Sequence, residues 1–212
     1  MTENIEVFKQ NSIRIRNGEQ TIYVDPFEMD GSPKDADLIL ITHDHYDHFS
    51  PEDIRKVACE NTVMVVPATM VEKAAEAERA VLRINPVEVG KHYEIDGLFF
   101  ETVASYNTLK PFHPKHAGNV GYILNIAGNR IYIAGDTDAT KEAKDVKCDV
   151  ALVPIGGTYT MDAKAAAELI NTICPKVAIP VHFGGIVGKK EDAAKFASLV
   201  KEPVIVEEKI RF

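Results

Sequence analysis

One short stretch of the chain, His43 to His48, contains three imidazoles and two carboxylates. It lies just beyond the apolar residues 37–41, which read as a strand. Polar groups crowded together in a packed protein lose free energy on leaving water unless partners satisfy them, and a metal ion does this for histidine and aspartate. The stretch therefore predicts a metal site.

The spacing within this stretch favours more than one ion. If the chain is extended where it leaves the strand, alternate residues share a face. His43, His45 and Asp47 would then point one way and His48 the other, so that one loop could serve two adjacent metal ions. A chance histidine cluster in a polar loop is the alternative, and the length of the motif argues against it.

A dinuclear site needs more donors than one loop supplies, and two other apolar segments end in such donors. Residues 131–134 lead into Gly135 and Asp136, where the glycine lets the backbone approach closely and the carboxylate could bridge two ions. Residues 177–181 end at His182. Each alone has a plain structural explanation, a turn aspartate and a core histidine, but together with the first stretch they predict a complete site.

The composition limits the class of protein. A chain of 212 residues with 45% hydrophobic content is expected to form one compact domain over residues 1–212. The net charge of -8, from 24 basic and 32 acidic residues, argues against a nucleic-acid partner. We expect a small-molecule substrate instead, and the sequence leaves the oligomeric state open.

The cysteines and the hydropathy pattern predict a location. Cys59, Cys148 and Cys174 are widely spaced, which fits small buried residues in a reducing compartment. The first residues lack the pattern of a signal peptide, and no apolar run is long enough for a membrane span. We therefore expect a cytoplasmic protein with no membrane span.

The local patterns predict an α/β protein. Alternating residues on both sides of Asn17-Gly18 predict a hairpin of residues 12–16 and 21–25, and Ser50 with Pro51 predicts the start of a helix that ends near residue 58. Two mixed sheets packed together with helices outside are the expected architecture. Further strands are predicted at residues 62–66, 87–89, 98–103, 120–126, 130–133, 151–154, 177–181 and 204–206, and helices at 69–80, 162–173 and 191–201.

The donor segments together resemble a known family. His43-x-His45-x-Asp47-His48, Gly135-Asp136-Thr137 and Pro180-Val181-His182-Phe183-Gly184 resemble, in order and separation, the metallo-β-lactamase superfamily of metal-dependent hydrolases. Within it, the chain looks most like the compact branch related to ascorbate-phosphate lactonases and N-acyl phosphatidylethanolamine phospholipase D. The resemblance spans nearly the whole chain and implies a four-layer αββα sandwich, with the metals at one edge between the sheets.

The resemblance also implies ligand roles. His43 and His45 match ligands of a first metal, Asp136 matches the bridging carboxylate, and the second metal's ligands are matched by Asp47, His48 and His182. Two ions are expected, Zn²⁺ first, with Mn²⁺ or Fe²⁺ as alternatives.

The first metal site departs from the family pattern. The family supplies a third histidine, and the corresponding place here offers Asn107, whose amide oxygen is a weaker ligand for zinc than an imidazole. Three outcomes remain open: a weak site that fills only with substrate, a preference for manganese or iron, or completion of the site by His113 or His116.

The predicted chemistry is hydrolysis. Two ions that share Asp136 would lower the pKa of a water between them and make hydroxide available for attack, while Asp47 orients that hydroxide. Asp47 and Asp136 are thus the expected catalytic residues. Tyr106, Lys110 and His113 are candidates to contact the substrate.

The leading hypothesis is a hydrolase that cleaves a small ester, lactone or phosphodiester. A metal-binding or sensing protein of the same fold, with a degenerate first site and no catalysis, is the alternative from another class. A nuclease is the main enzymatic rival, and the acidic composition weighs against it.

Overall fold

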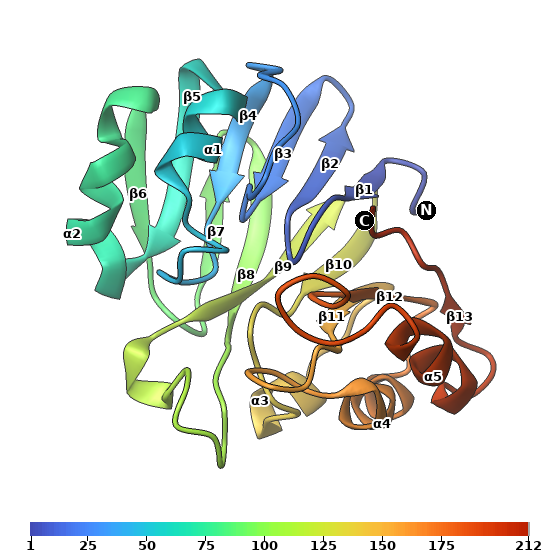
Figure 1. The fold of residues 1–212 in the computed structure, drawn as a ribbon. Helices are drawn as coiled ribbons and strands as arrows, with labels where there is room; N and C mark the ends of the chain where they lie inside the picture. The colour runs from blue at the N-terminus through green and yellow to red at the C-terminus, as the bar shows by residue number, and fades with distance from the viewer. Residues whose placement is uncertain (212) are drawn as a thin grey trace.

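Two β-sheets face each other, and helices cover the outer face of each sheet (Figure 1). The computed structural model describes residues 1–211. The first sheet has six strands in chain order, β1 (Ile5–Val7), β2 (Ile13–Asn17), β3 (Gln20–Val24), β4 (Ala36–Leu40), β5 (Ala58–Pro67) and β6 (Arg83–Val87). The second has seven, in the order β13 (Ile205–Val206), β12 (Val177–Val181), β11 (Val150–Pro154), β10 (Asn129–Ile133), β9 (Val120–Ile126), β8 (Leu98–Ala104) and β7 (His92–Ile95).

The helices form the two outer layers (Figure 1). Over the first sheet lie α1 (Pro51–Val57), α2 (Val71–Ala74) and the 3₁₀ segments η1 (Ala68–Met70) and η2 (Ala75–Ala80). Over the second sheet lie α3 (Lys141–Lys144), α4 (Ala163–Ile173) and α5 (Asp192–Leu199), while the 3₁₀ segment η3 (Lys115–Ala117) belongs to the connection between β8 and β9. The expected four-layer αββα sandwich is therefore confirmed. None of the helices within residues 1–211 is long and apolar enough to cross a bilayer.

The alternation of side chains along β4 shows how the layers are held. Leu38 and Leu40 belong to the core between the two sheets, whereas Ile39 and Ile41 pack under α1 and α2. Successive side chains of a strand point to opposite faces, so an unbroken apolar run buries both faces of its sheet.

Several predicted elements are confirmed. The hairpin is present as β2 and β3, with Asn17 opposite Gln20 at the turn. Helix α1 begins at Pro51, and the Ser50 side chain caps it by accepting a hydrogen bond from the Asp53 amide. These elements depend on local signals, which is why the sequence alone locates them.

Other predictions were wrong. The strand expected at 87–89 ends at Val87, and the helix expected at 69–80 is broken into η1, α2 and η2. None of these three pieces has a side-chain cap. Helix propensity alone, without such caps, does not hold a continuous helix here. The short strands β1 and β7 were missed. The expectation of buried cysteines was also wrong: Cys174 is exposed beyond α4, and Cys59 and Cys148 are only partly buried, although all three are unpaired.

Parallel strands bring the predicted donors to one edge of the sandwich. Strands β3 and β4 run parallel, as do β10, β11 and β12, so their carboxyl ends lie together. The two sheets meet there, because the Val120 amide donates to the Thr42 carbonyl at 3.0 Å. Gly135 has a φ of 64°, and a Cβ at this position would lie 3.2 Å from Ser105 Oγ and Thr42 Cβ. Only glycine fits here without displacing the chain beside the donors.

Asp53 fixes α1 to the loop that follows β3. Its buried carboxylate accepts from the backbone amides of Glu28 and Met29, at 3.0 and 2.9 Å, and from Lys56 Nζ at 2.9 Å. Burial opposes ionisation, but the contacts with Lys56, Ser50 and the backbone outweigh it and hold the pKa of Asp53 below its usual value.

The variant Asp53→Ala should lower the free energy of unfolding by about 3 kcal/mol, because two backbone amides lose their acceptor. Folding lowers the pKa of Asp53. Its contribution to the free energy of unfolding is therefore present above the pKa of the unfolded state and is lost as the pH falls through the pKa of the folded state. Urea unfolding of metal-free protein at pH 7 and below pH ~4 measures both effects. The exposed neighbour Glu52→Ala is the control and should cost less than about 0.5 kcal/mol. An equal loss in both variants would contradict the anchoring role.

Candidate metal centre

The predicted ligands converge at the shared edge of the two sheets. They form three overlapping groups, and within each group the ligand atoms all lie within 4.8 Å of one another. Each of the six histidines and aspartates expected as ligands belongs to one of them, and His113 joins them as a further member. The groups are His43, His45 and His113; His43, His48 and Asp136; and Asp47, His48 and His182.

The carboxylate of Asp136 lies between two sets of imidazoles. Its Oδ2 is 3.5 Å from His113 Nε2 and 4.0 Å from His43 Nε2. Its Oδ1 is 3.3 Å from His48 Nε2 and 3.4 Å from His182 Nε2. One oxygen therefore faces each set, which is the arrangement required of a bridging ligand.

The histidine loop is turned rather than extended. The carbonyl of His45 accepts hydrogen bonds from the amides of His48 and Phe49, at 3.0 and 2.8 Å. This turn places Asp47 on the side of His182, with Asp47 Oδ2 and His182 Nε2 3.2 Å apart. The expectation that Asp47 shares a face with His43 and His45 was wrong, because it assumed an extended chain. The partition implied by the family resemblance agrees with the geometry.

His113 completes the first group, and Asn107 lies behind it. His113 Nε2 is 2.9 Å from His45 Nδ1, which in turn is 3.1 Å from His43 Nε2. Asn107 contacts the opposite nitrogen of His113, Nδ1, at 3.3 Å, and donates to the Tyr159 carbonyl at 2.8 Å. The loop that follows β8 thus brings a third imidazole beside His43 and His45, whereas Asn107 does not reach them. His116 is exposed on η3 and belongs to none of the groups.

A buried carboxylate that the sequence analysis missed orients His48. Asp25 Oδ2 lies 2.7 Å from His48 Nδ1, which leaves Nε2 of that ring directed at the centre. Asp25 also accepts from Asn11 Nδ2 at 2.7 Å and from the hydroxyl and amide of Thr42 at 2.6 and 2.8 Å. Such partners fix the tautomer and orientation of a ligating histidine. The available signal was an acidic residue directly after a strand, in Val24-Asp25-Pro26.

Three residues of the centre have a left-handed backbone conformation. The φ angles are 44° for Asp25, 51° for His113 and 56° for His182. This conformation is uncommon outside glycine and concentrates at functional sites, where the surrounding structure enforces it. For His182, a hydrogen bond of 2.9 Å from its amide to the Gln10 carbonyl holds the turn.

The buried groups shift one another's protonation before any cation binds. Burial lowers the pKa of His43 well below its usual value and also lowers that of His113. Burial opposes the charged form of His48, but the carboxylates of Asp136 and Asp25 outweigh it and raise its pKa well above the usual value. Burial likewise opposes ionisation of Asp136, yet His182 and His48 hold its pKa well below the usual range.

This set of side chains suits bound cations. Ring nitrogens face each other at 2.9 to 3.2 Å in three pairs, so protons cannot occupy every position between them. Asp136 Oδ1 is buried and has no hydrogen-bond partner. Imidazoles and carboxylates with converging lone pairs are ligands for zinc and for other divalent transition metals.

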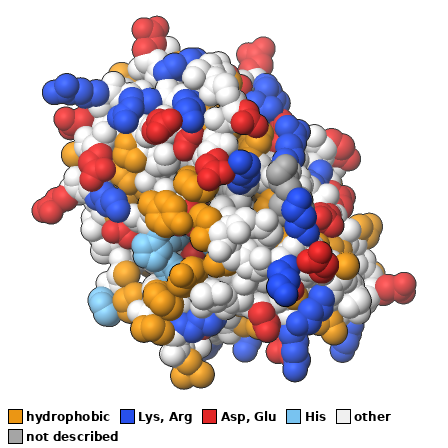
Figure 2. Space-filling view, viewed as in Figure 1, with side chains coloured by type: hydrophobic (Ala, Val, Ile, Leu, Met, Phe, Trp, Pro, Cys, Tyr) orange, Lys and Arg blue, Asp and Glu red, His pale blue; other side chains and the backbone are white. Residues whose placement is uncertain are grey.

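A cavity of about 230 Å³ opens onto the centre. His45, Asp47, His113 and Asp136 line its polar side, and Tyr46, Phe112, Tyr159 and Ile186 line its other walls. Figure 2 shows hydrophobic side chains adjoining an exposed histidine on this face.

The structure does not bring Tyr106 and Lys110 to this cavity. The Tyr106 hydroxyl donates to Glu142 at 2.8 Å, and Lys110 forms an ion pair with Asp138. Among the three candidates for substrate contact, only His113 lines the cavity.

One family model matches most of the chain. The sequence profile described as "Beta-lactamase superfamily domain" matches residues 4–182. The chain belongs to the β-lactamase superfamily. This confirms the resemblance inferred from the three donor segments, at the level of the superfamily.

Relatives and solved structures extend over almost the whole chain. A protein of Thermoplasma acidophilum named "UPF0173 metal-dependent hydrolase" is 33% identical over 86% of this chain and 84% of its own length. A relative of the same description from Thermus thermophilus is 29% identical, covering 91% of this chain and 88% of its own. A solved structure from Parabacteroides distasonis is 28% identical, with a TM-score of 0.79, and covers 97% of this chain and 91% of that one. The fold is also shared by a diiron β-hydroxylase from Streptomyces venezuelae at 14% identity, with a TM-score of 0.74 over 97% of this chain and 52% of that one.

Replacing His113 tests the composition of the first group. His113→Ala should lower zinc affinity at one of two sites by at least about 100-fold, because it removes a ligand, whereas Asn107→Ala should lower it by about 10- to 100-fold through loss of positioning. Zinc titration against a chelator of known affinity measures both. The exposed His116→Ala is the matched control and should bind as the native chain does. Retained affinity in His113→Ala would contradict the assignment.

Proposed function

We propose that this protein is a metal-dependent hydrolase with a dinuclear centre, Zn²⁺ being the first candidate metal. The observation that carries the proposal is the placement of Asp136, with one carboxylate oxygen toward His43 and His113 and the other toward His48 and His182. Relatives named as metal-dependent hydrolases over most of their length support the reaction class.

The donor sets assign ligands to each ion. His43, His45 and His113 would hold the first, and Asp47, His48 and His182 the second, with Asp136 shared. When bound, such ions act as Lewis acids and lower the pKa of water toward neutrality, which suits attack on a carbonyl or phosphoryl centre.

The side chains that border the cavity have distinct roles. Asp136 is almost fully buried, and its negative charge would offset the repulsion between two cations held close together. Asp47 borders the cavity and contacts His182. Burial opposes ionisation of Asp47, but His182 and His48 outweigh it and hold the pKa of its carboxyl below the usual value, which suits a charged ligand that orients the reacting group. His45 is exposed at the mouth, where substrate enters.

The substrate class that we propose is a small ester, lactone or phosphodiester. The cavity is small, and no lysine or arginine is among the side chains of residues 1–211 that line it. A nuclease would need cations along a phosphate backbone, so this lining weighs against that rival. The three unpaired cysteines fit the cytoplasmic location that we also propose.

The alternative of a metal-binding or sensing protein rested on a degenerate first site. His113, one of the two histidines that the sequence offered in place of Asn107, lies with His43 and His45 and would supply the third imidazole. That observation favours the enzyme over the sensor.

Asp136→Ala should remove the shared ligand and lower turnover by at least about 10³-fold while the fold is kept, since the sheets do not depend on this side chain. The assay is a panel of chromogenic esters, thiolactones and phosphodiesters with protein whose metal content is measured by mass spectrometry. Asp44→Asn is the matched control, because Asp44 is an exposed acid of the same loop outside the three groups. It should retain activity.

Chelation should abolish turnover of the native protein, and added zinc, manganese or iron should restore it. Two bound ions with no turnover across the panel would support the sensor. An active Asp136→Ala variant with two ions would contradict the shared-ligand mechanism.

A further inference from the structure

A second and larger cavity lies beside the one at the metal centre. Its volume is about 410 Å³, compared with about 230 Å³ at the centre. It is bordered by the loop that follows β12, by residues near β1 and by the C-terminal segment. The lining side chains include Phe27, Phe183, Ile186 and Ile210.

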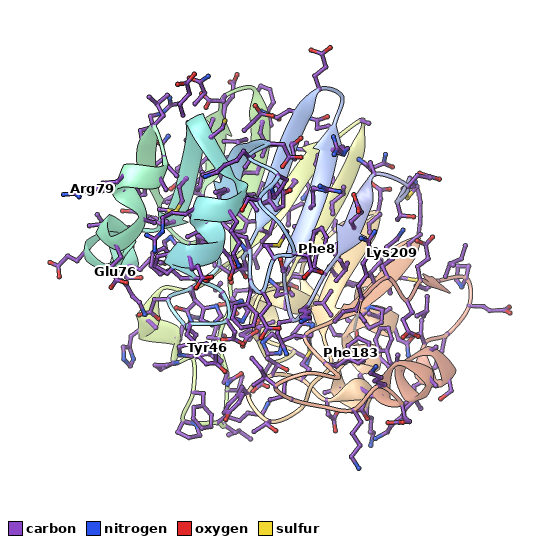
Figure 3. All side chains as sticks on the ribbon, turned by 45° about the horizontal axis from the view of Figure 1, so that its top comes forward. Phe8, Tyr46, Glu76, Arg79, Phe183 and Lys209 are labelled. Atoms are coloured by element: carbon purple, nitrogen blue, oxygen red, sulfur yellow. The ribbon has the colours of Figure 1, made fainter. Side chains whose placement is uncertain are left out.

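The two cavities share a wall. Ile186 lines both of them. Its side chain is 43% exposed, so it separates the two cavities only in part. Phe27 of the second cavity packs edge-on against Tyr46 of the first, with ring centroids 6.0 Å apart. Tyr46 lies on the loop after β4 and Phe183 on the loop after β12, and both are labelled in Figure 3.

The charged residues around the second cavity are compensated. Lys9 pairs with Glu28 at 2.8 Å, and Arg211 pairs with Glu6 at 2.9 Å. Lys190, also in the lining, is not free either. An anion would have to compete with these carboxylates, whereas an apolar group meets the aromatic rings and the alkyl stems of the long side chains. The lining therefore favours an uncharged apolar occupant.

We propose that the second cavity binds the apolar acyl chain of an ester whose carbonyl lies at the metal centre, with the chain crossing Ile186. This inference rests on the proposed hydrolase function and narrows it to carboxylic esters of medium-chain acids. Burying a methylene stabilises a complex enough to raise kcat/KM about fourfold, so chain length is the variable that reports on the cavity.

A substitution at Gly185 can block the second cavity without blocking the cavity at the metal centre. It lines that cavity and not the one at the centre, and its backbone is not left-handed. A Cβ at Gly185 would lie 2.5 Å from Gln10 Nε2, the flexible end of a side chain that borders the same cavity. We expect Gly185→Leu to fill the second cavity. Because the Gln10 carbonyl accepts from the His182 amide, zinc content of the variant is measured to check that the metal ligands stay in place. Ala197→Leu, on an exposed position of α5, adds the same side chain elsewhere.

The test is kcat/KM for p-nitrophenyl acetate, butyrate, hexanoate and octanoate. In the native protein and in Ala197→Leu, kcat/KM should rise with chain length from butyrate onward. Gly185→Leu should keep acetate turnover within about twofold and lose at least about tenfold on octanoate. Equal dependence on chain length in all three proteins would overturn the proposal. Faster cleavage of the mono-p-nitrophenyl ester of suberic acid than of p-nitrophenyl octanoate would also overturn it, because the suberic chain ends in a carboxylate.

A binding measurement separates this proposal from the proposed function. Calorimetric titration of the metal-loaded proteins with methyl ketones, from butan-2-one to decan-2-one, requires no turnover. Affinity that rises with chain length in the native protein but not in Gly185→Leu supports the second cavity, even if no ester is cleaved and the hydrolase function fails. Affinity independent of chain length in the native protein overturns it.

Discussion

The rest of the centre depends on one buried carboxylate placed between two sets of imidazoles. Asp136 is 3% exposed, and each of its oxygens faces a different pair of histidine rings. Charges in such a setting interact strongly, so the carboxylate and its neighbours hold each other's protonation in place. The same proximity disfavours protons on all of the facing nitrogens at once. Cations fit this arrangement better than protons do.

The arrangement of strands in the two sheets brings the Asp136 carboxylate and the imidazoles this close together. Parallel strands of both sheets end at one edge, and most of the site residues lie on the loops that leave them. His113 comes from the connection between the antiparallel strands β8 and β9. Gly135 lets those loops approach, while Asp25, His113 and His182 adopt left-handed conformations that only a surrounding network sustains. Asp25 then fixes the ring of His48 from behind. The packed core of the sandwich thus offsets the unfavourable backbone conformations at its edge.

Most of the strands, the hairpin and six of the seven grouped donors could be predicted from the sequence, because strand periodicity and the histidine motif are local patterns. The short strands β1 and β7 carry too few residues for such a pattern. His113 was only one of two candidates, since a loop's path depends on contacts distant in sequence, such as that of Asn107 with the Tyr159 carbonyl. Asp25 was missed because a lone aspartate after a strand has no distinctive spacing. The turn at His45 was missed because its hydrogen bonds are between backbone groups, which residue types do not reveal.

The most direct test of a shared carboxylate is a crystal structure of the zinc-loaded protein with anomalous scattering recorded at the zinc edge. We expect two peaks, one among His43, His45 and His113 and the other among Asp47, His48 and His182, with Asp136 in contact with both. A single peak, or two peaks of which only one contacts Asp136, would contradict a shared carboxylate.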